Sequence, residues 1–296
     1  IRRGIINYYQ RVQNSIDYME DNLTEKLVLK QVASQAFCSL YHFHRIFQGM
    51  CNLTVKEYIR KRRLTRAARE LIESDQRILD IALKFQYSSP EAFTRAFKQM
   101  YKITPSKFRK KYDKITNGFK RINLISIHHR NIKGGFFMKP KIITKDSFNV
   151  LGIEKKIDMD KNFVQVPKFW QNEMEAGICP KLATLPGVVK SGEILGLCSN
   201  FDEEKNQFSY IICTRVNTLD EIPDGMMVKE ISTARYAVFT AKGTVPEAVQ
   251  KVIRYVYQTW FPETNYDRGA GPEFELYDER ADGTDSAEVD IYIPIK

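Results

Sequence analysis

The sequence lacks the features that mark membrane, secreted and metal-bound proteins. No apolar run approaches the roughly 18 residues that a membrane span needs, and the first ten residues lack the apolar core of a secretory signal. The five cysteines form no CxxC pair. The one group of neighbouring cysteines and histidines has spacings that fit no standard zinc pattern; it comprises Cys38, His42, His44 and Cys51. We therefore expect a cytoplasmic protein with reduced thiols and with no metal, cofactor or membrane partner.

The second half of the chain also lacks the residues of the commonest catalytic sites. All four histidines lie before residue 136, and no glycine-rich phosphate loop, GxSxG turn or HExxH motif follows. Ordinary histidine-based acid–base and triad chemistry is thereby excluded from residues 136–296. We expect no enzyme. The alternative is a hydrolase that acts on a lipophilic electrophile, with Glu275 as the only candidate base.

Acidic and basic residues are unevenly divided along the chain. Residues 1–135 hold 27 lysines and arginines against 11 acids, a net charge of +16. Residues 136–296 hold 19 against 25, a net charge of −6, and the two values sum to the +10 of the whole chain. A basic half is suited to a phosphate backbone, so the two halves are expected to bind different partners.

Helix signals dominate the first 112 residues. An apolar stripe with helical spacing runs from Ile5 to Met19. Thr54 and Glu57 have the spacing of a capping box and begin a long helix. Ser-Pro at residues 89–90 and Thr-Pro at residues 104–105 begin two further helices. Residues 1–112 are therefore predicted to form an all-α domain.

The pattern changes after residue 112. Periodicity is weak over residues 113–137, which also hold the only Gly-Gly pair, so we expect a linker there. Alternating apolar segments follow: KIITKDSFNVLGIEKKI, EILGLCSN, FSYIICTRV, RYAVFTAKG, FELYD and VDIYIPI. Helical segments lie among them at residues 164–176 and 245–261. This order predicts that residues 138–296 form an α+β domain built from two similar halves. The resemblance to a known domain family, described below, implies that the domain has two layers and that its βαββ halves are related by a pseudo-twofold axis.

One short helix is written twice, at an offset of 50 residues. CSLYHFHRIFQ (38–48) and YSSPEAFTRAFK (87–98) align so that Phe43 and Phe47 match Phe93 and Phe97. The spacing of these phenylalanines predicts that they are buried. The opposite face of each copy is polar and is expected to point outward. It carries Tyr41, His44, Arg45 and Gln48 in the first copy and Glu91, Thr94, Arg95 and Lys98 in the second.

A short predicted helix and a brief turn precede each copy, at residues 29–36 and 78–85. This is the helix-turn-helix arrangement, in which the second helix enters the major groove of double-stranded DNA. The helix that joins the copies carries six basic residues that we expect to serve phosphate contacts and surface solvation: Arg60, Lys61, Arg62, Arg63, Arg66 and Arg69. Two merely solvated helices would not explain the duplication, the matched polar faces and the +16 charge together.

The segment YIRKRRLTRAARELI…ILDIALKFQYSSPEAFTRAFKQMYKITPSKFRKKY resembles the AraC/XylS family of bacterial transcription regulators, over about residues 5–112. The resemblance implies a DNA-binding domain with two helix-turn-helix units. By motif position, the candidates for DNA contact are Tyr41, His44 and Arg45 in the first unit, and Pro90, Glu91, Ala92 and Arg95 in the second, with Thr94 beside them. The glycines usual in the two turns are replaced by Phe37 and Gln86, and those after the two reading helices by Asn52 and Lys102.

Aromatic and acidic residues alternate in two strands of the second half. In FELYD, Glu275 and Tyr277 share one face, and Tyr292 of VDIYIPI is expected on the same side of the sheet. With Trp170 and Trp260 nearby, such a face would suit a lipophilic cation, because aromatic rings supply cation–π attraction and a carboxylate supplies the countercharge. The alternative is an ordinary wet sheet surface.

The segment ISTARYAVFTAKGTVPEAV…FELYDERADGTDSAEVDIYIPIK looks like the GyrI-like effector-binding domain, whose strand glutamate maps to Glu275. The order of the two domains resembles that of the Rob-like, multidrug-responsive regulators of the AraC family. This implies a monomeric or homodimeric regulator that binds a specific operator and recruits RNA polymerase under the control of a small lipophilic, often cationic, effector. A further alternative is a drug-sequestering protein that binds DNA only non-specifically.

Overall fold

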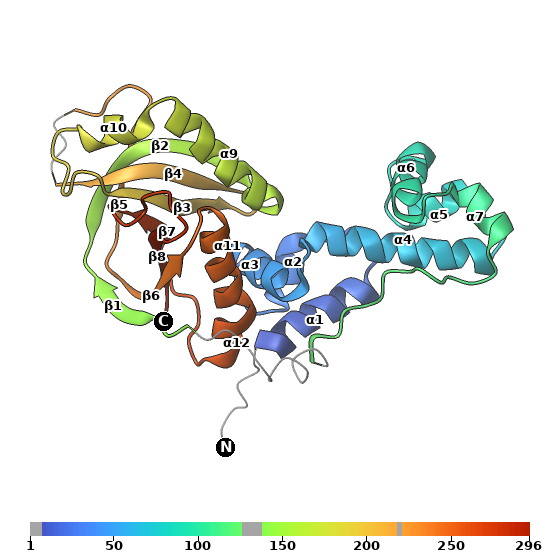
Figure 1. The fold of residues 1–296 in the computed structure, drawn as a ribbon. Coiled ribbons are helices and arrows are strands. Elements are labelled where there is room, and N and C mark those ends of the chain that lie inside the picture. The colour runs from blue at the N-terminus through green and yellow to red at the C-terminus, as the bar shows by residue number, and fades with distance from the viewer. Residues whose placement is uncertain (1–7, 126–137, 218–220) are drawn as a thin grey trace, which may run out of the picture. The chain divides into compact units, whose positions relative to one another are not determined.

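The computed structural model describes residues 8–125, 138–217 and 221–296. The chain divides into two compact units, residues 1–134 and 135–296, which Figure 1 colours from blue to green and from green to red. The fold classes predicted for the two halves are confirmed, because the first unit is helical where described and the second holds an antiparallel sheet with helices. Among the described residues, no helix has the length and apolar character that a membrane span requires.

The described first unit is built around one long helix, α4. In Figure 1, α1, α2 and α3 lie beside the start of α4, and α5, α6 and α7 lie at its end. The helices are α1 (Tyr8–Asp21), α2 (Leu29–Ser34), α3 (Leu40–Cys51), α4 (Val55–Glu73), α5 (Ile78–Lys84), α6 (Pro90–Tyr101) and α7 (Pro105–Lys111). The apolar stripe on α1 is confirmed for its described residues; Ile5 lies outside them.

Side-chain caps fix where the helices begin. The capping box of α4 is confirmed: the Glu57 backbone N–H donates to Thr54 Oγ1 at 3.2 Å, and the Thr54 backbone N–H donates to Glu57 Oε2 at 2.9 Å. Ser89 caps α6 by accepting from the Ala92 N–H at 3.2 Å, with Pro90 at the first helical position. Local sequence therefore decides these helix starts.

The two copies of the repeated helix are anchored in the same way. The rings of Phe43 and Phe47 lie 5.5 Å apart, and those of Phe93 and Phe97 also lie 5.5 Å apart. All four side chains are fully buried, as the repeat predicted. Each pair anchors its helix in its own small core, which leaves the opposite face of the helix free to differ between the copies.

Residues 113–125, predicted as the first part of a linker, pack against the first unit instead. The Phe119 ring lies against Tyr58 of α4, and Leu124 is buried. The prediction was wrong because a segment without helix or strand periodicity can still bury single apolar side chains. The rest of the predicted linker, residues 126–137, lies outside the described residues.

The second unit contains the described sheet. Its elements are β1 (Lys141–Lys145), β2 (Phe148–Asp158), the 3₁₀ turn η1 (Met159–Lys161), α9 (Asn162–Glu175), α10 (Ile178–Ala183), β3 (Ile194–Asp202), β4 (Gln207–Val216), β5 (Met227–Ile231), β6 (Ala234–Lys242), α11 (Glu247–Tyr255), the π-helical turn η2 (Val256–Trp260), α12 (Phe261–Glu263), β7 (Glu273–Tyr277) and β8 (Glu288–Pro294). The segments forming β5 and α10 were not expected from the sequence.

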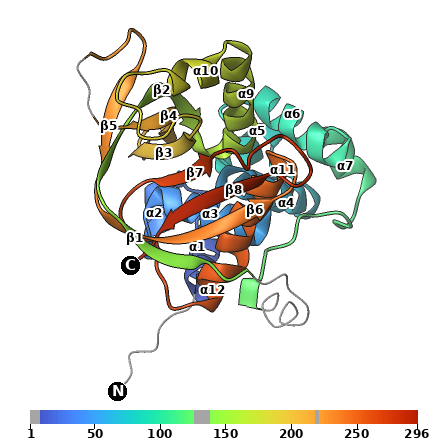
Figure 2. The ribbon, with the colours of Figure 1, turned by 60° about the vertical axis from the view of Figure 1, so that its left-hand side comes forward.

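The strand order shows the predicted pseudo-twofold repeat. The order in the sheet is β1-β6-β8-β7-β3-β4-β2-β5, all antiparallel. Two halves, β2-α9-β3-β4 and β6-α11-β7-β8, meet where β3 pairs with β7. The strand before each half pairs with the other half, since β1 precedes β2 but pairs with β6, and β5 precedes β6 but pairs with β2. This exchange ties the halves into one curled sheet (Figure 2).

Helices cover one face of this sheet. Phe169 of α9 lies against Tyr210 of β4, and Tyr255 of α11 lies against Phe239 of β6. The other face has its own apolar core, which includes Leu195, Leu197, Ile211, Tyr236 and Phe274. The helix-covered face is the one that holds Glu275, Tyr277 and Tyr210.

Candidate functional sites in the two units

The two predicted reading helices, α3 and α6, have matching backbone frames. Each ends at a residue in the left-handed conformation, Asn52 with φ 53° and Lys102 with φ 62°. Each is preceded by a turn residue in the same conformation, Phe37 with φ 54° and Gln86 with φ 64°. These four positions need the backbone that glycine adopts most easily, so the replacements seen in the sequence leave the turn geometry unchanged.

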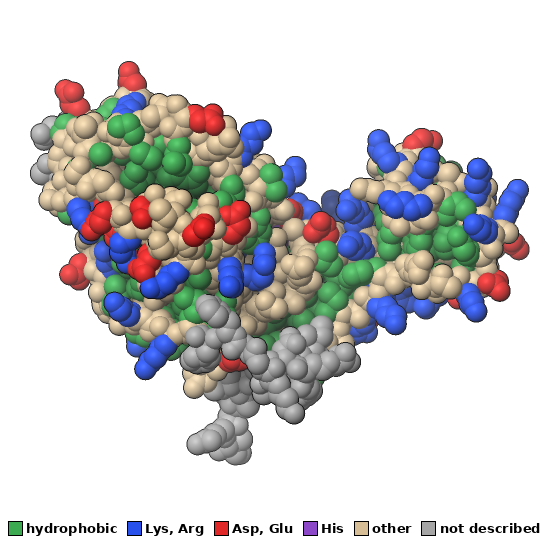
Figure 3. All heavy atoms as spheres, viewed as in Figure 1, with side chains coloured by type: hydrophobic (Ala, Val, Ile, Leu, Met, Phe, Trp, Pro, Cys, Tyr) green, Lys and Arg blue, Asp and Glu red, His purple; other side chains and the backbone are tan. Residues whose placement is uncertain are grey.

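The outward face of α6 is open. Glu91, Arg95 and Lys98 are exposed, and Pro90, Ala92 and Thr94 are half-buried; the role of these six residues in DNA contact stays a prediction. Figure 3 shows lysine and arginine side chains standing out over α5, α6 and α7. The pKa of Glu91 is lowered by hydrogen bonds from its own backbone N–H and from Ser89, so this carboxylate is held at the start of the helix.

The outward face of α3 is partly covered. Arg45 and Gln48 are half-buried, whereas Tyr41 and His44 are buried at 3% and 6% exposure. The prediction that Tyr41 and His44 are exposed was therefore wrong. Arg45 accounts for part of this burial, since its Nε donates to Tyr41 Oη at 3.1 Å and its guanidinium lies 5.5 Å from the ring centre. Helical spacing shows where a side chain points but not what covers it.

Two of the six basic residues on α4 bond to partners inside the first unit. Arg62 is buried, and Arg63 donates to the backbone carbonyls of Leu23 and Glu25 at 2.8 and 2.7 Å. These two were wrongly predicted as phosphate-facing, because charge alone does not reveal an internal partner. Arg60, Arg66 and Arg69 are exposed, and Lys61 is half-buried.

Arg62 forms a buried ion pair with Glu20 of α1. Its Nε lies 2.6 Å from Glu20 Oε1 and its Nη2 lies 2.8 Å from Oε2, and Tyr58 Oη donates to Oε1 at 2.9 Å. Burial acts to raise the pKa of Glu20, but the hydrogen bonds and charge of Arg62 outweigh it and lower the pKa overall. This pair joins α1 to α4 beneath the first helix-turn-helix unit.

Three of the predicted ligand residues come together in the second unit. Tyr210 Oη donates to Glu275 Oε2 at 2.6 Å, and Tyr277 Oη donates to the same oxygen at 3.2 Å. Trp170 of α9 donates its Nε1 proton to Tyr210 Oη at 2.8 Å, and its ring lies 5.0 Å from that of Tyr277. Burial, and next the charge of Glu275, raise the pKa of both tyrosines, so both remain proton donors.

Tyr210 is the member of this cluster that the sequence analysis missed. It reaches Glu275 across β3 at Gly196, which pairs with Glu275 in the sheet. A Cβ at position 196 would overlap the Tyr210 hydroxyl and lie 2.8 Å from Glu275 Oε2. An isolated glycine inside the strand pattern EILGLCSN was the available signal, since such a glycine marks a close approach of another group.

Two predicted ligand residues lie elsewhere. Tyr292 pairs with Phe274 in the sheet and stacks on it at 4.3 Å, so it lies on the face opposite Glu275, which pairs with Ile291. Trp260 is buried against Phe239 at 5.2 Å and is stacked on Tyr266 at 5.4 Å. The placement of Tyr292 with Glu275 was wrong, whereas Trp260 packs on the Glu275 face of the sheet, because Phe239 pairs with Ile291, which pairs with Glu275. The face on which Tyr292 lies relative to Glu275 depends on how β7 pairs with β8. The alternation of residues within one strand does not reveal this pairing.

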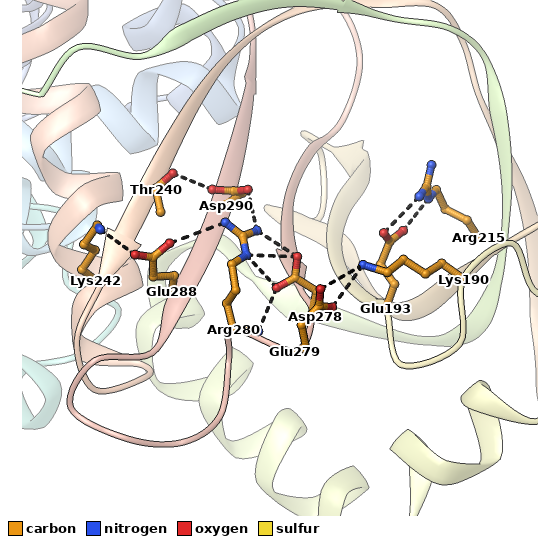
Figure 4. A network of polar contacts seen from close by, with 10 residues as sticks. All are labelled: Lys190, Glu193, Arg215, Thr240, Lys242, Asp278, Glu279, Arg280, Glu288 and Asp290. Carbon is orange, nitrogen blue, oxygen red and sulfur yellow. Dashed lines mark hydrogen bonds and ion pairs between the residues drawn. The ribbon is translucent and has the colours of Figure 1, made fainter.

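Ion pairs fix the hairpin that follows the Glu275 strand. Figure 4 shows Arg280 between Asp278 and Asp290, at 2.9 and 2.8 Å from their carboxylates. Lys190 lies 3.1 Å from Glu279 in the same network. Because Asp278 directly follows Tyr277, the network holds the end of β7 in place and with it the carboxylate and phenol of the cluster.

Comparison with known proteins places both units in families. The family model "Helix-turn-helix domain" matches residues 32–111, and the model "Integron-associated effector binding protein" matches residues 141–295. A solved structure from the mobile metagenome of Vibrio cholerae, an integron cassette protein, is 18% identical with a TM-score of 0.41 and covers 54% of this chain and 98% of that one.

Relatives match either the first unit or nearly the whole chain. The HTH-type transcriptional regulator YbfP of Bacillus subtilis is 45% identical over 103 residues, which are 34% of this chain and 35% of that regulator. The Right origin-binding protein of Escherichia coli is 26% identical over 274 residues, covering 90% of this chain and 89% of that protein. The chain therefore belongs to the AraC family of DNA-binding transcription regulators and, through residues 141–295, to the integron-associated effector-binding proteins.

Proposed function

We propose that this regulator binds a lipophilic cation at the cluster of Glu275, Tyr210, Tyr277 and Trp170, and that ligand binding changes its affinity for a specific operator or its recruitment of RNA polymerase. The observation that carries the proposal is a carboxylate held by two tyrosine hydroxyls beneath a tryptophan. Such a group supplies negative charge among aromatic faces, which is what a hydrophobic cation requires.

A role for Glu275 as the base of a hydrolase is less well supported. Its Oε2 already accepts hydrogen bonds from two tyrosines whose own pKa values are raised. These two bonds hold the carboxylate oxygen in a fixed position. The arrangement favours a fixed countercharge over a group that takes a proton from water.

Calorimetry with tetraphenylphosphonium tests the ligand proposal. We expect Glu275→Gln to weaken binding of this cation about tenfold or more, equivalent to at least about 1.4 kcal/mol. Binding of triphenylphosphine oxide, which is aromatic but neutral, should change little. The matched control is Glu230→Gln, which removes an exposed carboxylate from β5 of the same unit. Equal cation affinity in the wild type and in Glu275→Gln would sink the countercharge role.

For the DNA half, we propose that α3 and α6 each read one segment of the major groove. The exposed residues Arg95 and Lys98 of α6 support this, together with Arg45 and Gln48 on the corresponding face of α3. Tyr41 and His44 are buried, so the proposal gives the contacts of α3 to Arg45 and Gln48. Competition between one selected duplex and excess random DNA tests the proposal, since non-specific binding alone would not survive it.

A further inference from the structure

Residues 118–125 run as an irregular strap across the helices of the first unit. Toward α1, the Leu124 N–H donates to Gln13 Oε1 at 2.9 Å, and Arg121 Nη2 lies 2.5 Å from Asp17 Oδ1. Toward α4, the Phe119 carbonyl accepts from Arg62 Nη1, and the Phe119 ring lies 5.9 Å from that of Tyr58. The strap therefore bonds both to the helix that packs against the first helix-turn-helix unit and to the helix that joins the two units.

Thr65 of α4 links the strap to the second helix-turn-helix unit as well. Its Oγ1 accepts from the Phe119 N–H at 3.0 Å and from Tyr101 Oη at 3.4 Å, and donates to the Lys61 carbonyl at 2.9 Å. Tyr101 is the last residue of the reading helix α6. One threonine hydroxyl thus connects the strap, the joining helix and the end of the second reading helix.

The sequence has a glycine where the strap comes nearest to α4. A Cβ at Gly118 would lie 2.9 Å from the methyl group of Thr65 and 2.9 Å from Cγ2 of Ile115. Thr65 is β-branched and buried, so its methyl group has little room to move. Any side chain at position 118 would therefore push the strap away from Thr65.

We propose that the strap is a positioning element that fixes the spacing and rotation of α3 relative to α6. A single long helix can bend or twist slightly about its axis, whereas an element bonded to α1, to α4 and, through Thr65, to the end of α6 restrains that motion. The residues that carry this role are Arg62, Thr65, Gly118 and Phe119. The inference rests on the proposed reading of two major-groove segments by one chain.

The test uses the full chain and the duplex that it selects from a random pool. A second duplex carries one base pair inserted between the two read segments, which rotates one segment by about 34–36° relative to the other. The measured quantity is the ratio of affinities for the two duplexes. A loss of folded protein lowers both affinities equally and leaves this ratio unchanged.

We expect Thr65→Val and Gly118→Val each to shrink the wild-type ratio about fivefold, the factor that one net hydrogen bond of about 1 kcal/mol represents. Ser74→Ala is the matched control. Like Thr65, Ser74 has a hydroxyl that donates to a backbone carbonyl of α4, in this case that of Glu70, but it makes no bond to the strap. The control should keep the wild-type ratio. Hydrogen exchange on the wild type should show protected amides at Phe119 and Leu124.

Three outcomes would overturn the inference. They are a wild-type ratio near one, unprotected amides at Phe119 and Leu124, and an unchanged ratio in both strap variants. A chain that selects no duplex at all would instead overturn the proposed function, and this inference with it. Selection of a duplex together with an unchanged ratio in the variants would remove the strap's role alone.

Discussion

The two helix-turn-helix units share a frame and an aromatic core but differ in their polar support. Their phenylalanine pairs, helix caps and left-handed turns superimpose residue for residue in the sequence. Phe47 packs on Tyr58 as Phe97 packs on Phe108, 50 residues further along the chain, but the Tyr58 hydroxyl also donates to Glu20 of the buried Glu20–Arg62 pair. The repeat therefore keeps the aromatic core that presents each helix, while the polar contacts made to that core differ.

The outward faces differ as much as the supports. On α6, Arg95 and Lys98 are exposed, while on α3 Tyr41 and His44 are buried and Arg45 is bonded to Tyr41. An exposed arginine can reach a base edge without losing an internal hydrogen bond. Arg45 must give up its hydrogen bond to the Tyr41 hydroxyl before its Nε can contact DNA. We therefore expect an arginine of the second helix-turn-helix unit to contribute more to specific affinity than an arginine of the first.

The largest expected effect comes from breaking the polar support of the first unit. Glu20→Gln leaves Arg62 buried without its carboxylate, and removal of one partner from a buried pair costs about 3–5 kcal/mol. Urea unfolding followed by far-UV circular dichroism measures the loss. Both tryptophans lie in the compact unit of residues 135–296, so the unfolding transition that their fluorescence reports should not move.

The matched control for this variant is an ion pair next to the second helix-turn-helix unit, between α4 and α5. Glu70→Gln removes a pair with Lys84, whose side chain is 46% exposed, so it should cost under about 1 kcal/mol. Equal losses in the two variants would show that burial does not distinguish the supports of the two units.

The same pair predicts a pH dependence confined to the first unit. The folded pKa of Glu20 lies below its unfolded value, so its contribution is fully present above the unfolded pKa of about 4.3. That contribution is lost as the pH falls from there through the lowered folded pKa. In Glu20→Gln, the circular dichroism midpoint should therefore fall less steeply below pH 4.3 than in the wild type. Parallel curves would mean that other carboxylates account for acid sensitivity.

A smaller effect separates the two reading arginines. We expect Arg95→Ala to weaken binding to the selected duplex by about 1–3 kcal/mol, and Arg45→Ala by about 1 kcal/mol, because Arg45 already hydrogen-bonds Tyr41. Fluorescence anisotropy against specific and random duplexes measures both. A loss of the same size on random DNA would reduce the arginine concerned to a phosphate contact. An Arg45 effect larger than that of Arg95 would reverse the ranking of the two units.

What the sequence could predict depends on the range of the interaction. Helix starts such as Thr54 with Glu57 are decided within four residues, and the phenylalanine repeats within one helix, so both were predictable. Glu20 and Arg62 are 42 residues apart, and nothing in either segment announces the other. The strap was missed for a related reason, since Phe119 and Leu124 show no period.

The candidate ligand site illustrates the same limit. Glu275 and Tyr277 share a strand, and alternation placed them on one face. Tyr292 was misplaced because its side of the sheet depends on pairing with Phe274, which only the assembled sheet defines. Tyr210 comes from another strand, across Gly196, and the glycine in that strand was the single local trace of its approach.

The smallest expected effect distinguishes the two turns that hold left-handed non-glycine residues. Phe37 has φ 54° and is 70% exposed, so Phe37→Gly removes backbone strain and loses little buried surface. Strain of about 1–2 kcal/mol is offset in part by the greater freedom of glycine in the unfolded chain, so a net gain of up to about 1 kcal/mol is expected. Thermal unfolding by circular dichroism measures it.

Gln86→Gly should gain nothing by the same measurement, although φ is 64° there. The Gln86 side chain donates its Nε2 proton to the Thr24 carbonyl at 2.6 Å, and the loss of that bond offsets the relief of strain. Phe37→Ala is the control, because alanine keeps the Cβ that causes the strain. If Phe37→Ala stabilised the protein as much as Phe37→Gly, the gain would come from removing an exposed ring. If Gln86→Gly also stabilised it, the bond to Thr24 would contribute nothing, and the two turns would be equivalent.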